Sequence, residues 1–354
     1  MDGWNLWMKE RGHPAYRAKQ IWQHLYERRA GSFDAMTNLP KTMRDDLKAS
    51  LTFGDLMVAD ERVSRDGTLK RAYVLRDGQV IESVLMPYKD GRRTACISSQ
   101  AGCAMGCVFC ATGQMGFARQ LSSAEIVEQA LIFARELHQR GERLSNVVLM
   151  GMGEPLANYD NAMEAVERIN HDLGVGMRHI TVSTVGLPER IKQIADEGRQ
   201  VTLAVSLHAA SDQQRSALIP INKKHPIQQV MQACVYYCGK TGRRISFEWA
   251  LIAGETDTPQ QADQLGRLLS RAMRQGLIGH VNLIPVNPTE GYDGRPSSPL
   301  AVSSFIDTLK RHGVGATARL RRGIDIEGGC GQLKAETIKR QQKESQRGTV
   351  EVAA

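Results

Sequence analysis

The sequence contains no apolar run of membrane-spanning length and no basic-then-apolar signal segment at its start. It also contains no internal repeat and no low-complexity segment. Its cysteines number seven, and an odd number argues against the disulfide framework of a secreted protein. These absences predict a cytoplasmic protein that works in a reducing compartment and does not associate with membranes.

Chain length limits the number of domains, and net charge limits the kind of partner. A chain of 354 residues can bury a large core in one big domain and carry a small domain beside it. The formal net charge is +8 and the pI is near 9.2, which favours an anionic partner. A generally basic, solvated surface explains the same charge equally well, so charge alone does not identify the partner.

Three of the cysteines, Cys103, Cys107 and Cys110, stand in one short loop (the cysteine loop, residues 103–110). Structural zinc needs four ligands, and no second Cys or His pair with suitable spacing follows. A bacterial ferredoxin uses C-x₂-C-x₂-C with a fourth cysteine close behind, and inert core thiols rarely stand among glycines. The C-x₃-C-x₂-C spacing therefore predicts a [4Fe–4S] cluster with one iron open to S-adenosylmethionine (SAM), which the cluster can cleave to a 5′-deoxyadenosyl radical.

The pattern along the chain divides it into four segments. Residues 1–52 predict a small helical accessory domain, with Asn38 as the N-cap of its last helix; its basic and aromatic residues suit RNA binding, although a docking role fits as well. Residues 53–90 predict a β-hairpin linker around an Asp-Gly turn. Residues 91–334 predict a barrel domain, and the polar residues 335–354 predict a disordered tail.

Strands and helices alternate in the barrel segment. The expected strands span residues 94–99, 146–150, 179–184, 201–207, 244–251 and 280–286. Ser122 and Glu125 form a capping box ahead of the first long helix. Six βα units with right-handed crossovers predict an α/β fold, a partial (β/α)6 TIM-like barrel.

Chemistry in such barrels lies on the loops at the carboxyl ends of the strands. The cysteine loop follows the first strand, and polar or glycine-rich segments follow the others. The residues we expect to bind SAM are Gly153, Glu154, Ser183, Ser206, Leu207, His208 and Asn287. Glu154 can accept hydrogen bonds from an ammonium group or from ribose hydroxyls, and Ser206 and Leu207 are expected to act through their backbone. His208 either contacts the SAM adenine or merely caps its strand.

Segments 100–117, 150–158, 205–209, 219–223, 282–285 and 322–333 are similar to the RlmN family of radical SAM enzymes. That family methylates adenine C2 in 23S rRNA and in tRNA. The resemblance runs from about residue 16 to residue 333 and includes the accessory RNA-binding domain. One departure is Gly328-Gly329, where alanines are expected before the last cysteine.

The resemblance implies a relay through two further cysteines and two SAM molecules per turnover. One SAM methylates Cys330, and the radical from a second SAM takes a hydrogen from the methylated Cys330, whose methylene radical adds to adenine C2. Glu82 is the implied proton acceptor, and Cys96 then attacks the Cys330 sulfur and leaves a transient disulfide. The resemblance also implies a flavodoxin-like electron donor, a thiol reductant and a monomer. Without the resemblance, the sequence would predict that Glu82 is a solvated residue and that Cys96 is a small buried hydrophobic residue.

Several alternatives stay open at this point. A Cfr-like enzyme would use the same cysteines to methylate C8 of the same rRNA adenine, and an RNA-binding protein with a redox-sensing cluster would perform no methylation. Arg319, Arg321 and Arg322 suit phosphate binding next to the last cysteine, but they equally suit a solvated strand. Cys234 and Cys238 stand four apart on an expected helix, where core packing is favoured over metal binding.

Overall fold

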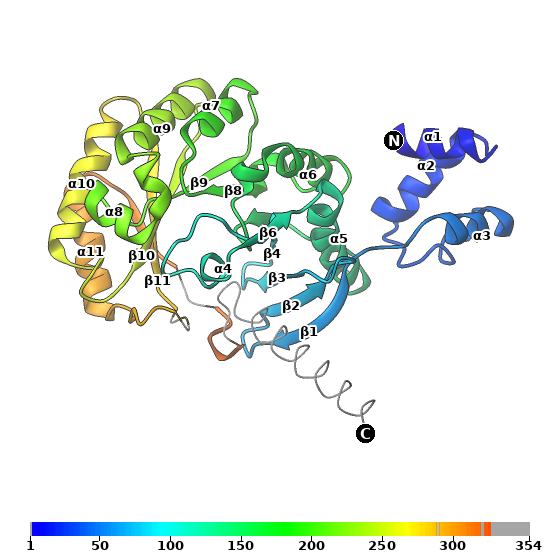
Figure 1. Ribbon diagram of the computed structural model, residues 1–354, viewed down its shortest axis with the longest axis horizontal. Helices are drawn as coiled ribbons and strands as arrows, with labels where there is room; N and C mark the ends of the chain where they lie inside the picture. The colour runs from blue at the N-terminus through cyan, green and yellow to red at the C-terminus, as the bar shows by residue number, and fades with distance from the viewer. Residues whose placement is uncertain (1, 288, 290, 320–321, 327–354) are drawn as a thin grey trace, which may run out of the picture.

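The structure is a computed structural model that describes residues 2–287, 289, 291–319 and 322–326. A small helical unit is followed by three antiparallel strands and then by a barrel of alternating strands and helices (Figure 1). The α-helices are α1 (Asp2–Glu10), α2 (Tyr16–Trp22), α3 (Lys41–Ser50), α4 (Ala111–Gln114), α5 (Ser123–Gln139), α6 (Tyr159–His171), α7 (Pro188–Asp196), α8 (Asp212–Leu218), α9 (Ile227–Thr241), α10 (Pro259–Met273) and α11 (Pro299–Arg311). The strands are β1 (Met57–Val63), β2 (Leu69–Val74), β3 (Val80–Pro87), β4 (Arg93–Cys96), β5 (Gln100–Gly102), β6 (Phe117–Gln120), β7 (Asn146–Leu149), β8 (Ile180–Thr184), β9 (Thr202–Ser206), β10 (Ile245–Leu251), β11 (Gly279–Pro285) and β12 (Ala316–Ala318).

Ten of these strands form one sheet in the order β1-β2-β3-β4-β7-β8-β9-β10-β11-β12, and β5 and β6 pair with each other. From β4 to β12 every neighbouring pair is parallel, as helical crossovers require. The partial barrel is therefore confirmed, with the six expected strands at their expected positions. The seventh parallel strand, β12, is not one of the six expected strands, because three residues of Ala-Thr-Ala carry no strand periodicity; it ends just before Arg319, for which a solvated strand was one alternative.

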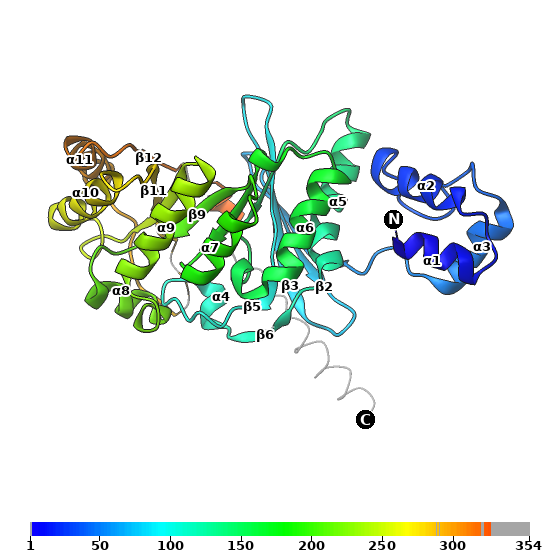
Figure 2. The same ribbon diagram turned by 90° about the horizontal axis from the view of Figure 1, so that it is seen from above.

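Helices cover the outside of the barrel. Helices α5, α6, α7 and α9 lie side by side along one face of the sheet (Figure 2). In β8, Ile180 and Val182 are buried, whereas the alternate residues Thr181 and Ser183 are only half-buried. Successive side chains of a strand point to opposite faces, so the buried pair faces the helices and the other pair faces the barrel interior. The interior side of this strand therefore carries polar, half-buried side chains.

The two expected helix caps have different outcomes. The capping box of α5 is confirmed: Ser122 Oγ accepts from the Glu125 N–H, and Glu125 Oε2 accepts from the Ser122 N–H. The expected cap of α3 is wrong, because Asn38 lies outside the cap position and its side-chain oxygen contacts His24 instead. Pro40 takes the cap position, and it has no side-chain oxygen to offer the helix.

Strands β1–β3, which we call the extension, form an antiparallel ribbon. The expected hairpin is confirmed, since β2 pairs with β3 around a turn at residues 75–79. Strand β3 also pairs antiparallel with β4, so the extension continues the barrel sheet rather than standing apart from it. Residues on β2 and β3 consequently belong to the same sheet as residues on the first barrel strand, and those in register with one another share a face.

The N-terminal helical unit has its own small core, which includes the fully buried Met36. Two hydrogen bonds connect it to the barrel helix α6 and the residue after that helix. Trp22 Nε1 donates to Asp172 Oδ1 at 3.1 Å, and Arg168 Nη2 donates to Tyr26 Oη at 2.7 Å. A third joins Arg29 Nη2 to Leu173 O at 3.1 Å, and Tyr26, Trp22 and Leu25 pack against the barrel core, so the unit meets the barrel through both polar and apolar contacts.

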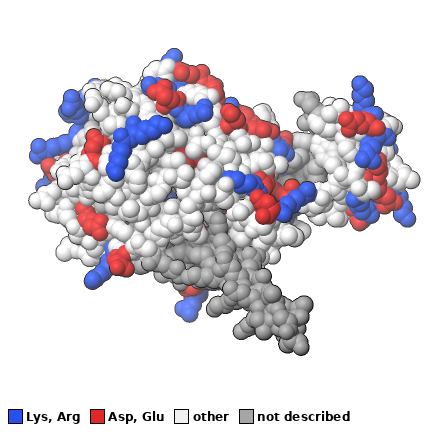
Figure 3. All heavy atoms as spheres, in the orientation of Figure 1, with Lys and Arg blue, Asp and Glu red and all other residues white. Residues whose placement is uncertain are grey.

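Helix length and surface charge are relevant to the expected absence of a membrane and to the expected RNA partner. No helix in the described part of the chain is both long and apolar enough to cross a membrane. On the face drawn in Figure 3, Lys and Arg side chains are interspersed with Asp and Glu side chains. This face therefore presents mixed charge rather than a continuous basic patch.

Candidate active site

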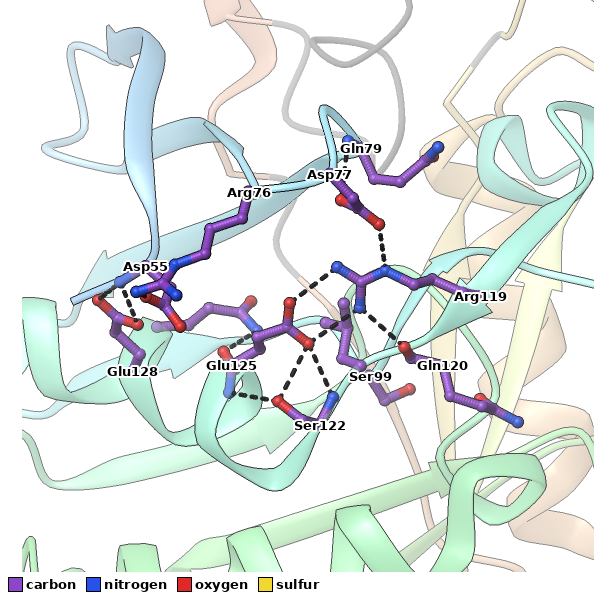
Figure 4. A network of polar contacts seen from close by, with 12 residues as sticks. Asp55, Arg76, Asp77, Gln79, Ser99, Arg119, Gln120, Ser122, Glu125 and Glu128 are labelled. Atoms are coloured by element: carbon purple, nitrogen blue, oxygen red, sulfur yellow. Dashed lines mark hydrogen bonds and ion pairs between the residues drawn. The ribbon is translucent and has the colours of Figure 1, made fainter. Parts of the chain in front are cut away.

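The cysteine loop is held in place by the strands on either side of it. It lies between the paired strands β5 and β6, and the Cys103 N–H donates to Gly116 O at 2.8 Å. Arg119 on β6 donates to the two carboxylate oxygens of Glu125 at 2.8 and 3.0 Å and also binds Asp77 in the β2–β3 turn (Figure 4). Because Glu125 also caps α5, Arg119 joins the loop to both α5 and the extension. Sequence reasoning had not singled out Arg119.

The three thiols of the loop are half-buried, free of disulfides and close enough to influence one another. Burial raises the pKa of Cys103 to about 11 and also raises the pKa of Cys107, and the charge of Cys110 adds to both shifts. Among the described residues, no three His, Cys, Asp or Glu side chains converge on a site for one metal ion. A cubane cluster does not need such convergence, because each thiolate binds a different iron atom, so the loop fits a [4Fe–4S] cluster.

The turn after β7 places a buried carboxylate beside the cysteine loop. Glu154 accepts the Leu156 N–H at 3.1 Å through Oε1 and the Val185 N–H at 2.7 Å through Oε2. Burial raises the pKa of Glu154 to about 7, against the effect of these hydrogen bonds. Gly153 has a φ of 103°, and a Cβ there would lie 2.5 Å from Gln100 Cβ, so only glycine fits the turn. Each Glu154 oxygen retains a lone pair that can accept from an ammonium group.

The carboxyl ends of β8 and β9 bring the next expected residues to the same edge. Ser183 and Ser206 are half-buried, whereas His208 is buried. The Ala250 N–H donates to His208 Nδ1 at 2.8 Å, so the neutral ring carries its hydrogen on Nε2. The ring of Phe109, from the cysteine loop, meets the His208 ring edge-on at 4.9 Å. His208 therefore joins the end of β9 to the cysteine loop.

Arg215 on α8 holds this edge together, and sequence reasoning missed it. Its guanidinium is completely buried and donates to the carbonyl oxygens of Ser206 and Leu207, each at 3.1 Å, and to that of Val185. It also donates to Asn222 Oδ1 at 2.9 Å. Burial lowers the pKa of Arg215 to about 10. An arginine on a short polar helix ordinarily signals a solvated side chain, so the sequence carried no sign of this role.

Glu82 and Cys96 share one face of the sheet with a lysine. Lys70 on β2, Val84 on β3 and Cys96 on β4 are in register, and Glu82 is two residues from Val84 on the same strand. Lys70 Nζ lies 3.2 Å from Glu82 Oε2, and the two side chains are 0% and 2% exposed. The alternative reading of Glu82 as a solvated residue is therefore wrong, because the extension continues the barrel sheet and the Glu82 side chain is buried.

Two other expected site residues have different outcomes. Cys330 lies outside the described residues, as do Arg321 and residues 335–354. Asn287 is half-buried and follows β11, so it lies at the same carboxyl edge as the other SAM candidates.

The remaining arginines of the expected phosphate cluster contact the protein itself. Arg319 Nε lies 3.8 Å from Glu248 Oε2, and Arg319 Nη1 lies 3.8 Å from Met150 Sδ. The Arg322 guanidinium stands 4.1 Å from the centre of the Tyr88 ring. Arg319 nevertheless keeps 46% of its side chain exposed, whereas Arg322 keeps 19%. Arg322 is thus committed to the protein, and of these two described arginines Arg319 is the one exposed enough to meet a phosphate as well.

Known proteins resemble this chain over nearly its whole length. Residues 97–265 match the model of the Radical SAM superfamily, and residues 2–52 match that of the ribosomal RNA large subunit methyltransferase N-terminal domain. The chain is 49% identical over 348 residues to the dual-specificity RNA methyltransferase RlmN 1 of Myxococcus xanthus. That alignment covers 98% of this chain and 93% of the Myxococcus protein. It is 46% identical over 336 residues to a probable dual-specificity RNA methyltransferase RlmN of Clostridium perfringens, covering 94% of each. The crystal structure of a radical SAM methyltransferase from Sphaerobacter thermophilus matches with a TM-score of 0.88 and 45% identity, covering 93% of this chain and 95% of that one.

A partial barrel with a three-cysteine loop after its first strand defines a radical SAM enzyme, which works with a [4Fe–4S] cluster and SAM. Cys103, Cys107 and Cys110 are the residues that would hold the cluster. The level of identity over nearly the full length then narrows the class, and the chain belongs to the RlmN family.

Proposed function

We propose that this protein methylates C2 of an adenosine in the peptidyl-transferase centre of 23S rRNA, and C2 of the adenosine 3′ of the anticodon in tRNA. The relatives that are named dual-specificity RNA methyltransferases support the proposal. The observation that carries it is the position of Glu82 and Cys96. They share one face of neighbouring strands, at the edge where the cysteine loop begins.

In this proposal each residue has a chemical role. The cluster and SAM, when bound, supply a radical able to activate a methyl group, and two SAM molecules are used per turnover. Cys330 carries the methyl group as a thioether and becomes joined to adenine C2. Glu82 takes the C2 proton, and the one unpaired electron left on the adduct would return to the oxidised cluster, when that cluster is bound. The Cys96 thiolate then attacks the Cys330 sulfur, the sulfur–carbon bond breaks with its electron pair on carbon, and that carbon is protonated to a methyl group.

The proposal also assigns residues to SAM binding. Gly153 and Glu154 would receive the SAM amino group, and Ser183, Ser206 and the backbone of Leu207 the ribose. His208 and Asn287 would lie beside the adenine. The buried hydrogen bonds of Glu154 and the closure of this edge by Arg215 support the assignment, because they fix the backbone groups before SAM arrives.

The partners follow from the chemistry. The N-terminal helical unit would bind folded RNA, and the target adenine must leave its stack at a cost of a few kcal/mol, which favours loops and incompletely folded rRNA. A flavodoxin-like donor would reduce the cluster and a thiol reductant would reopen the Cys96–Cys330 disulfide. The protein would act as a monomer in the cytoplasm, where free thiols persist.

The proposal is tested by anaerobic turnover of the reconstituted enzyme with transcribed 23S rRNA fragments and tRNA. Mass spectrometry of the digested RNA should show 2-methyladenosine. Cys330→Ala should give no product, and Cys96→Ala should accumulate a covalent protein–RNA adduct. Cys234→Ala, which removes a buried thiol from α9, serves as the control and should retain turnover.

Two results would contradict the proposal in different ways. If the digest contains 8-methyladenosine instead, the protein is a Cfr-like C8 methyltransferase. If reduction in the presence of SAM releases no 5′-deoxyadenosine, the cluster has a structural or sensing role and the protein is not a radical SAM methyltransferase.

A further inference from the structure

The short segment of residues 322–326 lies against the extension. Asp325 is its main hydrogen-bond acceptor. Ser64 Oγ donates to Asp325 Oδ1 at 2.5 Å, and the Arg65 N–H donates to Asp325 Oδ2 at 3.1 Å. These hydrogen bonds, that of Ser64 first, lower the pKa of Asp325. Both donors belong to the β1–β2 turn, so Asp325 binds that turn through a side chain and a backbone group at once.

Arg322 makes a second connection, at the far end of β3. Its Nη1 donates to Pro87 O at 2.7 Å and lies 3.9 Å from Asp66 Oδ2. Its guanidinium stacks over Tyr88, whose ring also receives the guanidinium of Arg92 at 4.5 Å. The planar guanidinium thus combines a hydrogen bond with a cation–π contact, which a lysine at this position would not reproduce.

Gly323 lets the segment approach the turn closely. Its φ is 59°, and its N–H donates to Asp66 Oδ2 at 3.3 Å. A Cβ at this position would lie 3.2 Å from Ile326 Cγ1 and 3.4 Å from Thr68 Cγ2. Ile326 is 8% exposed, so the segment also buries an apolar side chain. Polar contacts, backbone conformation and apolar burial therefore all favour the same docked position.

The docked segment lies close to the strand of Cys96, because Pro87, which Arg322 contacts, pairs with Arg93 three residues before Cys96 on β4. The Arg319 N–H donates to Leu283 O on β11 at 2.8 Å, and Arg322, three residues later, contacts Pro87 at the end of β3. Three residues span at most about 11 Å, so the Arg322 backbone lies within that distance of the Arg319 backbone. Figure 1 shows the last coloured segment lying near β1 and β2. Strand β3 is the strand that carries Glu82 and pairs with the strand of Cys96.

We propose that Arg322 and Asp325 form a latch on the extension that positions the chain leading to Cys330 within reach of Cys96. The latch is defined by the contacts of Arg322 and Asp325 with Ser64, Arg65 and Pro87. Its residues are positioning residues, since they act through the chain and touch no reacting atom. The inference rests on the proposed function for the role of Cys330 as the reactive thiol.

The size of the expected effect follows from chain length. Cys330 is four residues beyond Ile326 but eleven residues beyond Arg319, the last described residue before the latch. The effective concentration of a tethered group falls roughly as the −3/2 power of the tether length. Releasing the latch should therefore lower the encounter rate of the Cys330 and Cys96 thiols about fivefold.

The test measures that encounter without RNA. The anaerobic holoenzyme is treated with oxidised glutathione, which takes two electrons and two protons from the thiols of Cys96 and Cys330 and becomes two glutathione thiols. Peptide mapping by mass spectrometry follows formation of the Cys96–Cys330 disulfide. Asp325→Asn and Arg322→Lys should each slow it, and together they should slow it about fivefold. Asp307→Asn and Arg271→Lys, exposed on α11 and α10, should leave the rate unchanged.

Further readouts separate positioning from folding. Iron content and melting temperature should match those of the control variants, while kcat for RNA methylation falls with the disulfide rate and KM for RNA stays constant. Ser64→Ala removes a single hydrogen bond and provides a milder variant. Ser64→Ala combined with Asp325→Asn should slow the reaction no more than Asp325→Asn alone, because the two residues form one contact.

The outcomes distinguish the latch from the methylation itself. Unchanged disulfide rates in the latch variants overturn the latch, even if the wild-type enzyme makes 2-methyladenosine. Absence of the Cys96–Cys330 disulfide in the wild type also overturns it. If the rates fall as expected but no 2-methyladenosine forms, the latch stands and the proposed RNA activity fails.

Discussion

The ammonium of Lys70 lies 3.2 Å from the carboxylate of Glu82, and both side chains are buried on neighbouring strands of the extension. A charge in such a place is stable only with its partner, because burial removes the water that would otherwise solvate it. Lys70 is also in register with Cys96, two strands away through Val84. The ion pair therefore fixes the direction of the proposed proton acceptor relative to the resolving thiol.

Removing Lys70 alone should be costly. We expect Lys70→Met to lower the free energy of unfolding of the apoprotein by about 3–5 kcal/mol, because it leaves a buried carboxylate unpaired. Lys70→Met with Glu82→Leu should recover much of that loss and yet methylate no RNA. Urea unfolding and turnover assays measure the two effects.

The control for this ion pair is an exposed one. Lys192 lies 3.1 Å from Glu189 on α7, with 41% and 81% of the two side chains exposed. Lys192→Met should change the free energy of unfolding by less than about 1 kcal/mol. Equal stability of the Lys70→Met and Lys192→Met variants would show that the buried pair does not support the extension.

Arg215 should be needed for SAM binding although it is proposed to touch no SAM atom. Arg215 donates to three backbone carbonyl oxygens and to the side-chain oxygen of Asn222. A lysine has a single ammonium group and cannot reach all four acceptors at once. We expect Arg215→Lys to weaken SAM binding to the reconstituted enzyme about tenfold, measured by calorimetry. Arg267→Lys, on the exposed face of α10, should bind SAM normally. If Arg215→Lys binds SAM normally, the ends of β8 and β9 keep their geometry without the hydrogen bonds of Arg215.

His208 should make the protein sensitive to acid. Burial first, and the charge of Arg215 second, lower its pKa from 6.5 to about 3. Between these values the unfolded chain binds a proton that the folded chain does not, so stability falls as pH drops below 6.5, by up to about 1.4 kcal/mol per pH unit. The variant His208→Asn tests this, because Asn tolerates the His208 φ of 57° and can accept the Ala250 N–H.

The measurement for His208 is a comparison of unfolding free energies. The difference between wild-type and His208→Asn apoprotein should shift in favour of the variant as pH falls from 6.5 to 5. A difference that is independent of pH would show that His208 titrates normally in the folded protein.

Gly153→Ala should abolish SAM-dependent release of 5′-deoxyadenosine. The new Cβ combines an unfavourable φ of 103° with a contact of 2.5 Å to Gln100 Cβ. Gly141→Ala is the matched control, since Gly141 has a φ of 70° but nothing within 4 Å of the added Cβ. It should lower stability by about 1–2 kcal/mol and leave radical chemistry intact. Equal activity of the two variants would contradict the tight turn at Gly153.

Predictions from the sequence succeeded where the signal is local. The cysteine loop, the α5 capping box and the hairpin turn each lie within a few consecutive residues, so spacing alone reveals them. The barrel strands also follow from short apolar runs between helices. By contrast β12 was too short to show a period, and the expected cap at Asn38 failed because Pro40 takes the N-cap position and the helix begins at Lys41.

The amino-acid sequence by itself determined the class of chemistry, because three thiols at fixed spacing need no tertiary structure to be recognised as ligands. It also determined which strand ends meet at one edge, since parallel strands leave little choice. Only the tertiary structure decided which charged residues are buried. In the sequence, Lys70 and Arg215 look like solvated residues. The fold places Glu82 beside Lys70 and three backbone carbonyls beside Arg215. Burial depends on partners that are distant in the chain, and no local pattern encodes them.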